Sequence, residues 1–132
     1  MNRLAIILAA GMAACLPVSA AAAFELSSFD WGNIKRCTSG NPNTVTNPTF
    51  VLKGVPDATA KLRFKMVDRD VPDYNHGGGT VAFTGATTIK PGAFKYQSPC
   101  PPSGSHTYQW TVTALDAAGK SVGSAKASKR YP

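Results

Sequence analysis

The stretch SPCPPSGSHTYQWTVTALD, residues 98–116, combines a rigid loop with the clearest strand pattern in the chain. Three prolines fix φ and remove backbone donors, so residues 98–103 are incompatible with a helix interior or a central strand. From His106 onward, apolar residues occupy every second position: Tyr108, Trp110, Val112 and Ala114. This alternation is typical of a strand with one buried face. It predicts a strand over residues 106–115, with His106 and Tyr108 on one face beside the proline loop.

A second strict alternation runs through KLRFKMV, residues 61–67. Leu62, Phe64 and Met66 are expected to face the core, while the cations at positions 61, 63 and 65 face water. We interpret this row of cations as protection of an exposed sheet edge against aggregation, rather than as an anion-binding surface.

The remaining segments are short and rich in turn residues. Further strands are expected within residues 24–37, 50–52, 80–84, 93–97 and 120–131. Loops and turns are expected at residues 38–48, 53–59, 68–79 and 89–92. The last strand is expected to pair with residues 106–115. Because no amphipathic helix is recognisable after residue 23, the predicted fold class is all-β with antiparallel sheets.

The N-terminus has the features of a secretory signal peptide. Arg3 precedes an apolar run that ends at Leu16, and a small-residue tract follows it. We expect cleavage after Ala23, with lipoprotein acylation at Cys15 as the alternative. The apolar run is too short for a comfortable membrane span. The sequence therefore predicts a periplasmic or secreted protein with a single domain over residues 24–132 and no integral membrane span.

The charge balance and the cysteines fit an exported domain. The formal net charge is +7, which favours anionic neighbours, whereas export argues against nucleic acid as a specific partner. Cys37 and Cys100 remain after the expected cleavage, and an oxidising compartment favours a disulfide between them. Two free thiols and metal binding are the alternatives, although no CxxC spacing accompanies the pair.

A second polar cluster follows residues 61–67. Asp68 and Asp70 share one face of an extended chain, and Pro72 keeps the preceding residue out of helical space. His76 comes next and is followed by three glycines at positions 77–79. The glycines lack the context of a nucleotide phosphate-binding loop. They indicate either a close backbone approach or a mobile loop beside His76.

The motifs DRDVP at 68–72, SPCPPSGSHTY at 98–108 and ALD at 114–116 resemble those of the phosphatidylethanolamine-binding protein family. The resemblance is to its bacterial branch, often called Raf-kinase-inhibitor-like, and covers roughly residues 48–131 in order. The chain departs from the family pattern at Arg69, Ser98 and Thr107, and by its glycines after His76. It also has a short turn after residue 116, where bacterial relatives insert a helix, and so resembles a shortened, exported member.

The resemblance implies a β-sandwich and a small pocket that binds an anion or a phospholipid head group, without catalysis and without a cofactor or metal. The residues it implies for ligand binding are Asp68, Asp70, Pro72, His76, Ser98, Pro99, His106 and Tyr108. Carboxylates beside imidazoles favour the protonated histidines, so the pKa values of His106 and His76 are expected above about 6.5.

Two other functions remain open from the residues themselves. The Asp and His set is compatible with a hydrolase, whether metal-dependent or not, and with a first-row metal ion such as Zn²⁺. No GxSxG elbow supports a serine nucleophile. The third interpretation is a protein-binding, protease-inhibitor-like module that acts through the loops at residues 73–79 and 98–105.

Overall fold

The computed structural model describes residues 13–17 and 22–132. Most of the predicted signal peptide therefore lies outside the described residues. Within the described ranges no helix forms, so none is present with the length and apolar character needed to span a membrane. The all-β prediction is confirmed.

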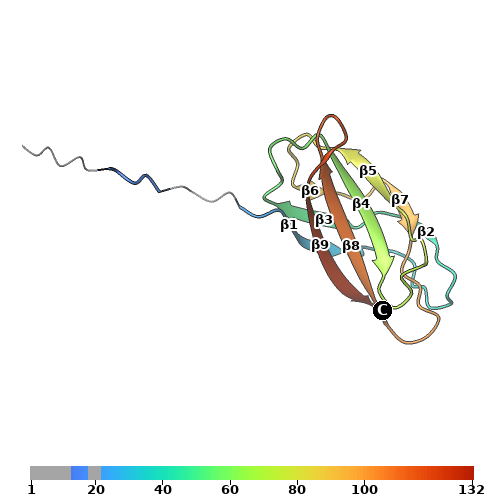
Figure 1. Ribbon diagram of the computed structural model, residues 1–132. Helices are drawn as coiled ribbons and strands as arrows, with labels where there is room; N and C mark the ends of the chain where they lie inside the picture. The colour runs from blue at the N-terminus through green and yellow to red at the C-terminus, as the bar shows by residue number, and fades with distance from the viewer. Residues whose placement is uncertain (1–12, 18–21) are drawn as a thin grey trace, which may run out of the picture.

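In the described part of the chain, nine strands form three antiparallel sheets (Figure 1). The largest sheet has the order β5-β4-β8-β9, a second has the order β1-β3-β6, and β2 pairs with β7. The bounds are β1 Glu25–Asp30, β2 Thr44–Thr46, β3 Thr49–Lys53, β4 Lys61–Asp68, β5 Gly78–Ala82, β6 Thr88–Ile89, β7 Lys95–Gln97, β8 His106–Leu115 and β9 Ser121–Tyr131.

The β4–β8–β9 ladder is the framework of the large sheet. All of β4 pairs with β8, and β9 pairs with the other side of β8, so the predicted pairing of the last strand is confirmed. The inward residues of both alternating segments are buried, which confirms their predicted orientation: Leu62, Phe64, Met66, Tyr108, Trp110, Val112 and Ala114.

The core lies between the large sheet and the β1-β3-β6 sheet, which stands behind it in Figure 1. Phe50 of β3 packs against Phe64 of β4 and Trp110 of β8, with ring centroids 4.5 and 5.1 Å apart. Phe29 of β1 belongs to the same cluster. The two sheets therefore pack face to face through aromatic side chains, in a sandwich arrangement.

The structure corrects the interpretation of the basic row on β4. β4 lies between β5 and β8, so it is an inner strand, and the edges of its sheet are β5 and β9. Lys61, Arg63 and Lys65 are exposed on the outer face of the sheet. Edge protection therefore does not explain these three cations.

Several expected boundaries also change. The segment 24–37 contains only β1, the expected loop at 38–48 contains β2, and β6 precedes the turn at residues 90–92. The β5 strand starts at Gly78 and includes two of the three consecutive glycines. A Cβ atom at Gly79 would lie 2.5 Å from the Cβ of Phe94. The close-approach interpretation is therefore confirmed for Gly78 and Gly79, whereas no atom lies within 4 Å of a Cβ at Gly77.

Candidate functional site

The candidate site lies where the inward faces of β4 and β8 continue beyond the core. Asp68 ends β4 and follows Met66 in the inward series, while His106 begins β8 and precedes Tyr108 in its own series. Asp68 and Tyr108 are directly paired across the two strands. Strand alternation alone therefore brings Asp68, His106 and Tyr108 to one end of the sandwich.

Asp68 is 4% exposed and organises this end. Its Oδ2 accepts a hydrogen bond from Nδ1 of His106 at 2.6 Å. Its Oδ1 accepts from the backbone N–H groups of Asp70 and Val71, at 2.9 and 3.3 Å. Since both carboxylate oxygens have donors, Asp68 fixes the His106 ring and the turn after β4 together.

His76 is 3% exposed, and it lies between two tyrosines. Its ring centroid is 4.6 Å from that of Tyr74 and 5.5 Å from that of Tyr108. Its Nδ1 donates to the carbonyl oxygen of Gln97 at 2.9 Å. Burial lowers the pKa of His76 below its ordinary value of 6.5, although the Gln97 carbonyl and the Asp68 charge oppose this. The expectation of a raised pKa for His76 is therefore wrong, because desolvation outweighs the nearby carboxylate.

Tyr108 is fully buried. Its hydroxyl oxygen accepts a hydrogen bond from the backbone N–H of Cys100 at 3.2 Å. Burial and the negative charge of Asp68 raise the pKa of Tyr108 above its ordinary value. The phenol is therefore neutral at physiological pH, and it links β8 to the proline-rich loop.

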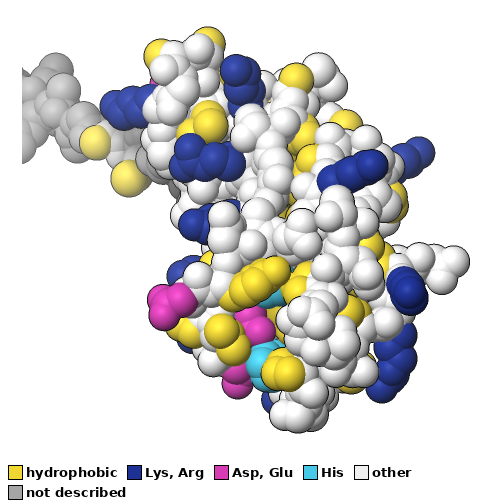
Figure 2. Space-filling model, turned by 90° about the vertical axis from the view of Figure 1, so that its right-hand side faces the viewer, with side chains coloured by type: hydrophobic (Ala, Val, Ile, Leu, Met, Phe, Trp, Pro, Cys, Tyr) yellow, Lys and Arg dark blue, Asp and Glu magenta, His cyan; other side chains and the backbone are white. Residues whose placement is uncertain are grey.

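The four side chains border a pocket of about 240 Å³. In Figure 2 acidic and histidine side chains are visible in a hollow among hydrophobic side chains. Neither lysine nor arginine lines it. The residues around the pocket are Gly40, Pro42, Asp68, Val71, Tyr74, His76, Cys100, Pro102, His106 and Tyr108.

Four of the residues implied by the resemblance do not line this pocket. Asp70 is exposed, and its Oδ2 accepts from the Thr107 backbone N–H at 2.8 Å, which fastens the turn to β8. Pro72 is exposed in the same turn. Ser98 and Pro99 are buried outside the pocket lining, and the Ser98 hydroxyl accepts a hydrogen bond from the Asn43 backbone N–H at 3.0 Å.

The pocket also contains residues that sequence reasoning did not select. Gly40 and Pro42 come from the segment expected to be an ordinary loop, and Val71 and Tyr74 come from the turn after β4. The expected Cys37–Cys100 disulfide was the available signal for the first pair, because it brings residues 38–42 beside the proline loop. No periodicity marks Val71 or Tyr74.

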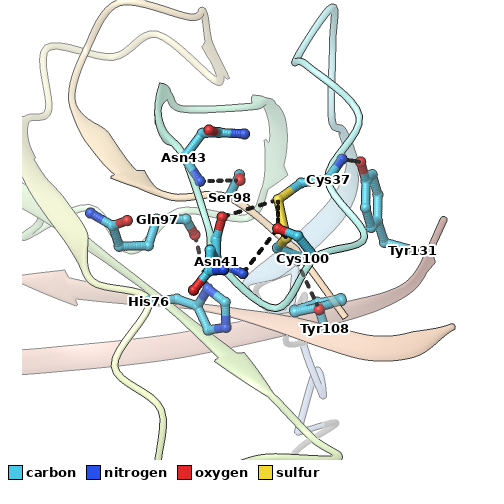
Figure 3. The surroundings of a disulfide bond; sticks show 10 residues. Cys37, Asn41, Asn43, His76, Gln97, Ser98, Cys100, Tyr108 and Tyr131 are labelled. Carbon is cyan, nitrogen blue, oxygen red and sulfur yellow. Dashed lines mark hydrogen bonds between the residues drawn. A yellow bond between two sulfur atoms is a disulfide. The ribbon is translucent and has the colours of Figure 1, made fainter. Parts of the chain in front are cut away.

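Cys37 and Cys100 form the expected disulfide, with their Cα atoms 4.6 Å apart. Figure 3 shows a tyrosine hydroxyl bonded to the backbone of each cysteine. The Cys37 backbone N–H donates to Tyr131 at 2.9 Å, as that of Cys100 does to Tyr108. The disulfide thus joins two neighbouring loops that both contribute to the pocket lining.

Asp68, Asp70 and His106 are also close enough to share a metal ion, since one ligand atom from each lies within 4.8 Å of the others. The carboxylate oxygens of Asp68 and one oxygen of Asp70 already accept hydrogen bonds. A cation between them would have to displace the His106 contact. Within the described chain, this arrangement fits a hydrogen-bonded support better than an open coordination site.

The profile of the family described as phosphatidylethanolamine-binding protein matches residues 25–130. A crystal structure described as a phosphatidylethanolamine-binding protein homologue from Chlamydia trachomatis D/UW-3/CX is similar in fold, with a TM-score of 0.59 and 16% sequence identity. That similarity covers 83% of this chain and 97% of the other chain. The curated proteins compared with the chain include no match. The family profile spans the whole sandwich, and we conclude that this chain belongs to the phosphatidylethanolamine-binding protein family.

Proposed function

We propose that this protein is exported and binds a small anion, such as a phosphate or a phospholipid head group, in the pocket at the end of β4 and β8. Family membership supports a binding function in general. The pocket supports a small anion or a head group as the ligand, because its volume of about 240 Å³ suits a head group rather than a whole lipid. The N-terminal sequence pattern supports export.

The observation that carries the proposal is the arrangement of the two histidines. Each uses Nδ1 for a protein acceptor, His76 for the Gln97 carbonyl and His106 for Asp68. The Nε2 atoms are left available to a ligand. Protonation of Nε2 creates a charged N–H donor, which binds anions more strongly than a neutral donor does. Anion binding at this site should therefore be accompanied by proton uptake.

A ligand with an apolar part beside its anionic group fits the pocket best. Val71 and Tyr74 are 44% and 41% exposed, and both line the pocket. They offer contact area to the alkyl or aromatic portion of a phosphoester. The same two exposed side chains, Tyr74 in the 73–79 loop and Val71 just before it, favour a protein partner at this surface as a second candidate.

The hydrogen bonds of the site favour binding over catalysis. A hydrolase would need an acid or base free to exchange protons with substrate and a nucleophile or activated water beside it. The carboxylate of Asp68 is engaged by three donors. Ser105 donates its hydroxyl hydrogen to the Pro132 carbonyl at 3.2 Å. We therefore propose a non-catalytic role, with Asp68 as the support of His106.

Calorimetric titration with phosphoethanolamine and inorganic phosphate tests this proposal. The affinity of the wild type should be at least about fivefold higher at about pH 5.5 than at about pH 8, because histidine loses its proton between these values. His106→Asn keeps a donor for Asp68 but removes Nε2, and it should lower the affinity at the acidic pH. Ser103→Ala, in the neighbouring loop, is the matched control and should bind as the wild type does. Equal binding at both pH values, or undiminished binding by His106→Asn, would overturn the proposal.

A further inference from the structure

The outer face of the large sheet carries a separate feature, a field of cations. Lys65, Thr111 and Lys126 form one row across β4, β8 and β9. Arg130 lies on the same face of β9, opposite Thr107. We call this surface the basic face; its cations are Lys61, Arg63, Lys65, Lys126 and Arg130.

No acidic residue stands among the outward residues of β4, β5, β8 and β9, all of which the structure describes. The other outward residues of the basic face are uncharged: Val67, Thr80, Thr107, Gln109, Thr111, Thr113, Ser124 and Ser128. Asp70 reaches one end of this face, where its Oδ2 accepts a hydrogen bond from the backbone N–H of Thr107. The other acidic side chains of the described sandwich lie at the pocket, in the turns at residues 57, 73 and 116, and on β1. Among the described residues the one ion pair joins Asp68 to His106. The five cations therefore act as a field of one sign.

The cations form a two-dimensional array. On β4 they recur every second residue, about 6.5–7 Å apart, and the β9 cations lie two strand spacings away, about 9.5 Å. A linear polyanion would contact the cations of one strand, whereas a planar anionic surface would contact the cations of β4 and β9 at the same time. No aromatic side chain lies among the outward residues of β4, β8 and β9 that would stack on nucleic-acid bases.

The β5 border of the basic face is hollowed. Arg63 and Lys65 line a depression of about 280 Å³ together with the glycine run at 77–79. Glycines leave the backbone accessible there, since they carry no side chain. The depression offers room for a phosphate between two cations and the glycine backbone.

We propose that the basic face docks the protein flat on a bilayer surface that contains anionic lipids. Each cation near such a surface adds Coulombic attraction that weakens with distance over a Debye length, so binding depends on both lipid charge and salt. The contact is superficial, because the face lacks large apolar side chains that would insert between lipids. The pocket uses the inward side chains of β4 and β8, so docking and pocket binding are separate properties.

Sedimentation with vesicles tests the docking surface. Vesicles of phosphatidylcholine with about one third phosphatidylglycerol supply the anionic surface without ethanolamine, and a variant of the pocket reports any contact of the pocket with their phosphodiesters. Partitioning of the wild type onto these vesicles should fall at least about tenfold when the salt concentration is raised from about 0.05 to 0.5 M. It should fall by a similar factor when the vesicles contain phosphatidylcholine alone. His106→Asn should partition as the wild type does, which separates this test from that of the pocket.

Charge reversal distinguishes the basic face from net charge. The triple variant Arg63→Glu, Lys65→Glu, Lys126→Glu should lose at least about tenfold in partitioning. The control Lys53→Glu, Lys90→Glu, Lys95→Glu has the same net charge, changes exposed residues off this face, and should retain much more binding. Thermal unfolding of both variants verifies that they fold. Equal losses in the two variants would overturn the proposal, as would binding of linear polyphosphate through this face without binding to vesicles.

Discussion

The middle and the pocket end of the β4–β8 pair have the same alternation but are covered by different structures. In the middle, Phe64 and Trp110 meet Phe50 of the second sheet, and aromatic rings fill the space between the layers. At the end, Asp68 and Tyr108 continue the same inward rows but face the loops that carry Gly40, Pro42, Cys100 and Pro102.

The difference shows how a sandwich acquires a pocket without a dedicated element. Loops stiffened by proline and joined by a disulfide stay in place, but they supply no large side chain to fill the layer gap. Polar residues at the strand ends then become accessible while their backbones remain fixed by the ladder. The rigidity of the core is thus transmitted to Asp68 and His106 through the strands themselves.

Removal of a ring in the middle should have the largest effect on stability. Trp110 is fully buried among aromatic neighbours, so Trp110→Ala should lower the free energy of unfolding by about 3–5 kcal/mol. Trp110→Phe, which keeps most of the packing, is the control and should lose less. Urea unfolding followed by circular dichroism measures both. A loss below about 1 kcal/mol for the alanine variant would show that the two layers do not pack as described.

Loss of the disulfide should have the next largest effect, and it should affect the pocket end first. Cys37 and Cys100 are separated by 63 positions, and the double variant Cys37→Ala, Cys100→Ala should lose about 2–4 kcal/mol of stability. Hydrogen exchange should become faster in the loops at residues 37–43 and 98–104, while the middle of β8 stays protected. Uniform acceleration along the chain would contradict a local role for the bond.

Asp68 and Asp70 both hold the ends of β4 and β8 together, but Asp68 is buried and Asp70 is exposed. Asp68→Asn should cost about 1.5–3 kcal/mol, because an amide donor then faces the Nδ1 donor of His106 inside a buried site. Asp70→Asn removes charge from an exposed contact with Thr107 and should cost less than about 1 kcal/mol. The same urea titration compares them. A reversed order would mean that Asp70, rather than Asp68, holds the strand ends together.

The sequence predicted the strands with clear alternation and the residues that those strands carry. Asp68, His106 and Tyr108 could be brought together because each continues an apolar series of period two. The inner position of β4 could not be predicted, since alternation does not tell which strands flank it. Ser98 and Pro99 were expected at the ligand, and they are buried outside the pocket lining, whereas Gly40 and Pro42 line the pocket and were not predicted. All four residues lie in loops, where side-chain direction follows no period.

NMR of the two histidines tests the central claim, that the pocket end takes up an anion together with a proton. Without ligand, the pKa of His76 should lie below 6.5, because burial disfavours its charged form. Addition of inorganic phosphate should shift the imidazole signals of both His76 and His106 and raise the pKa of at least one of them. In the His106→Asn variant at about pH 8, added phosphate should leave the imidazole signals of His76 unshifted. Imidazole signals and pKa values that phosphate leaves unchanged in the wild type, at any pH where the protein is folded, would contradict the claim.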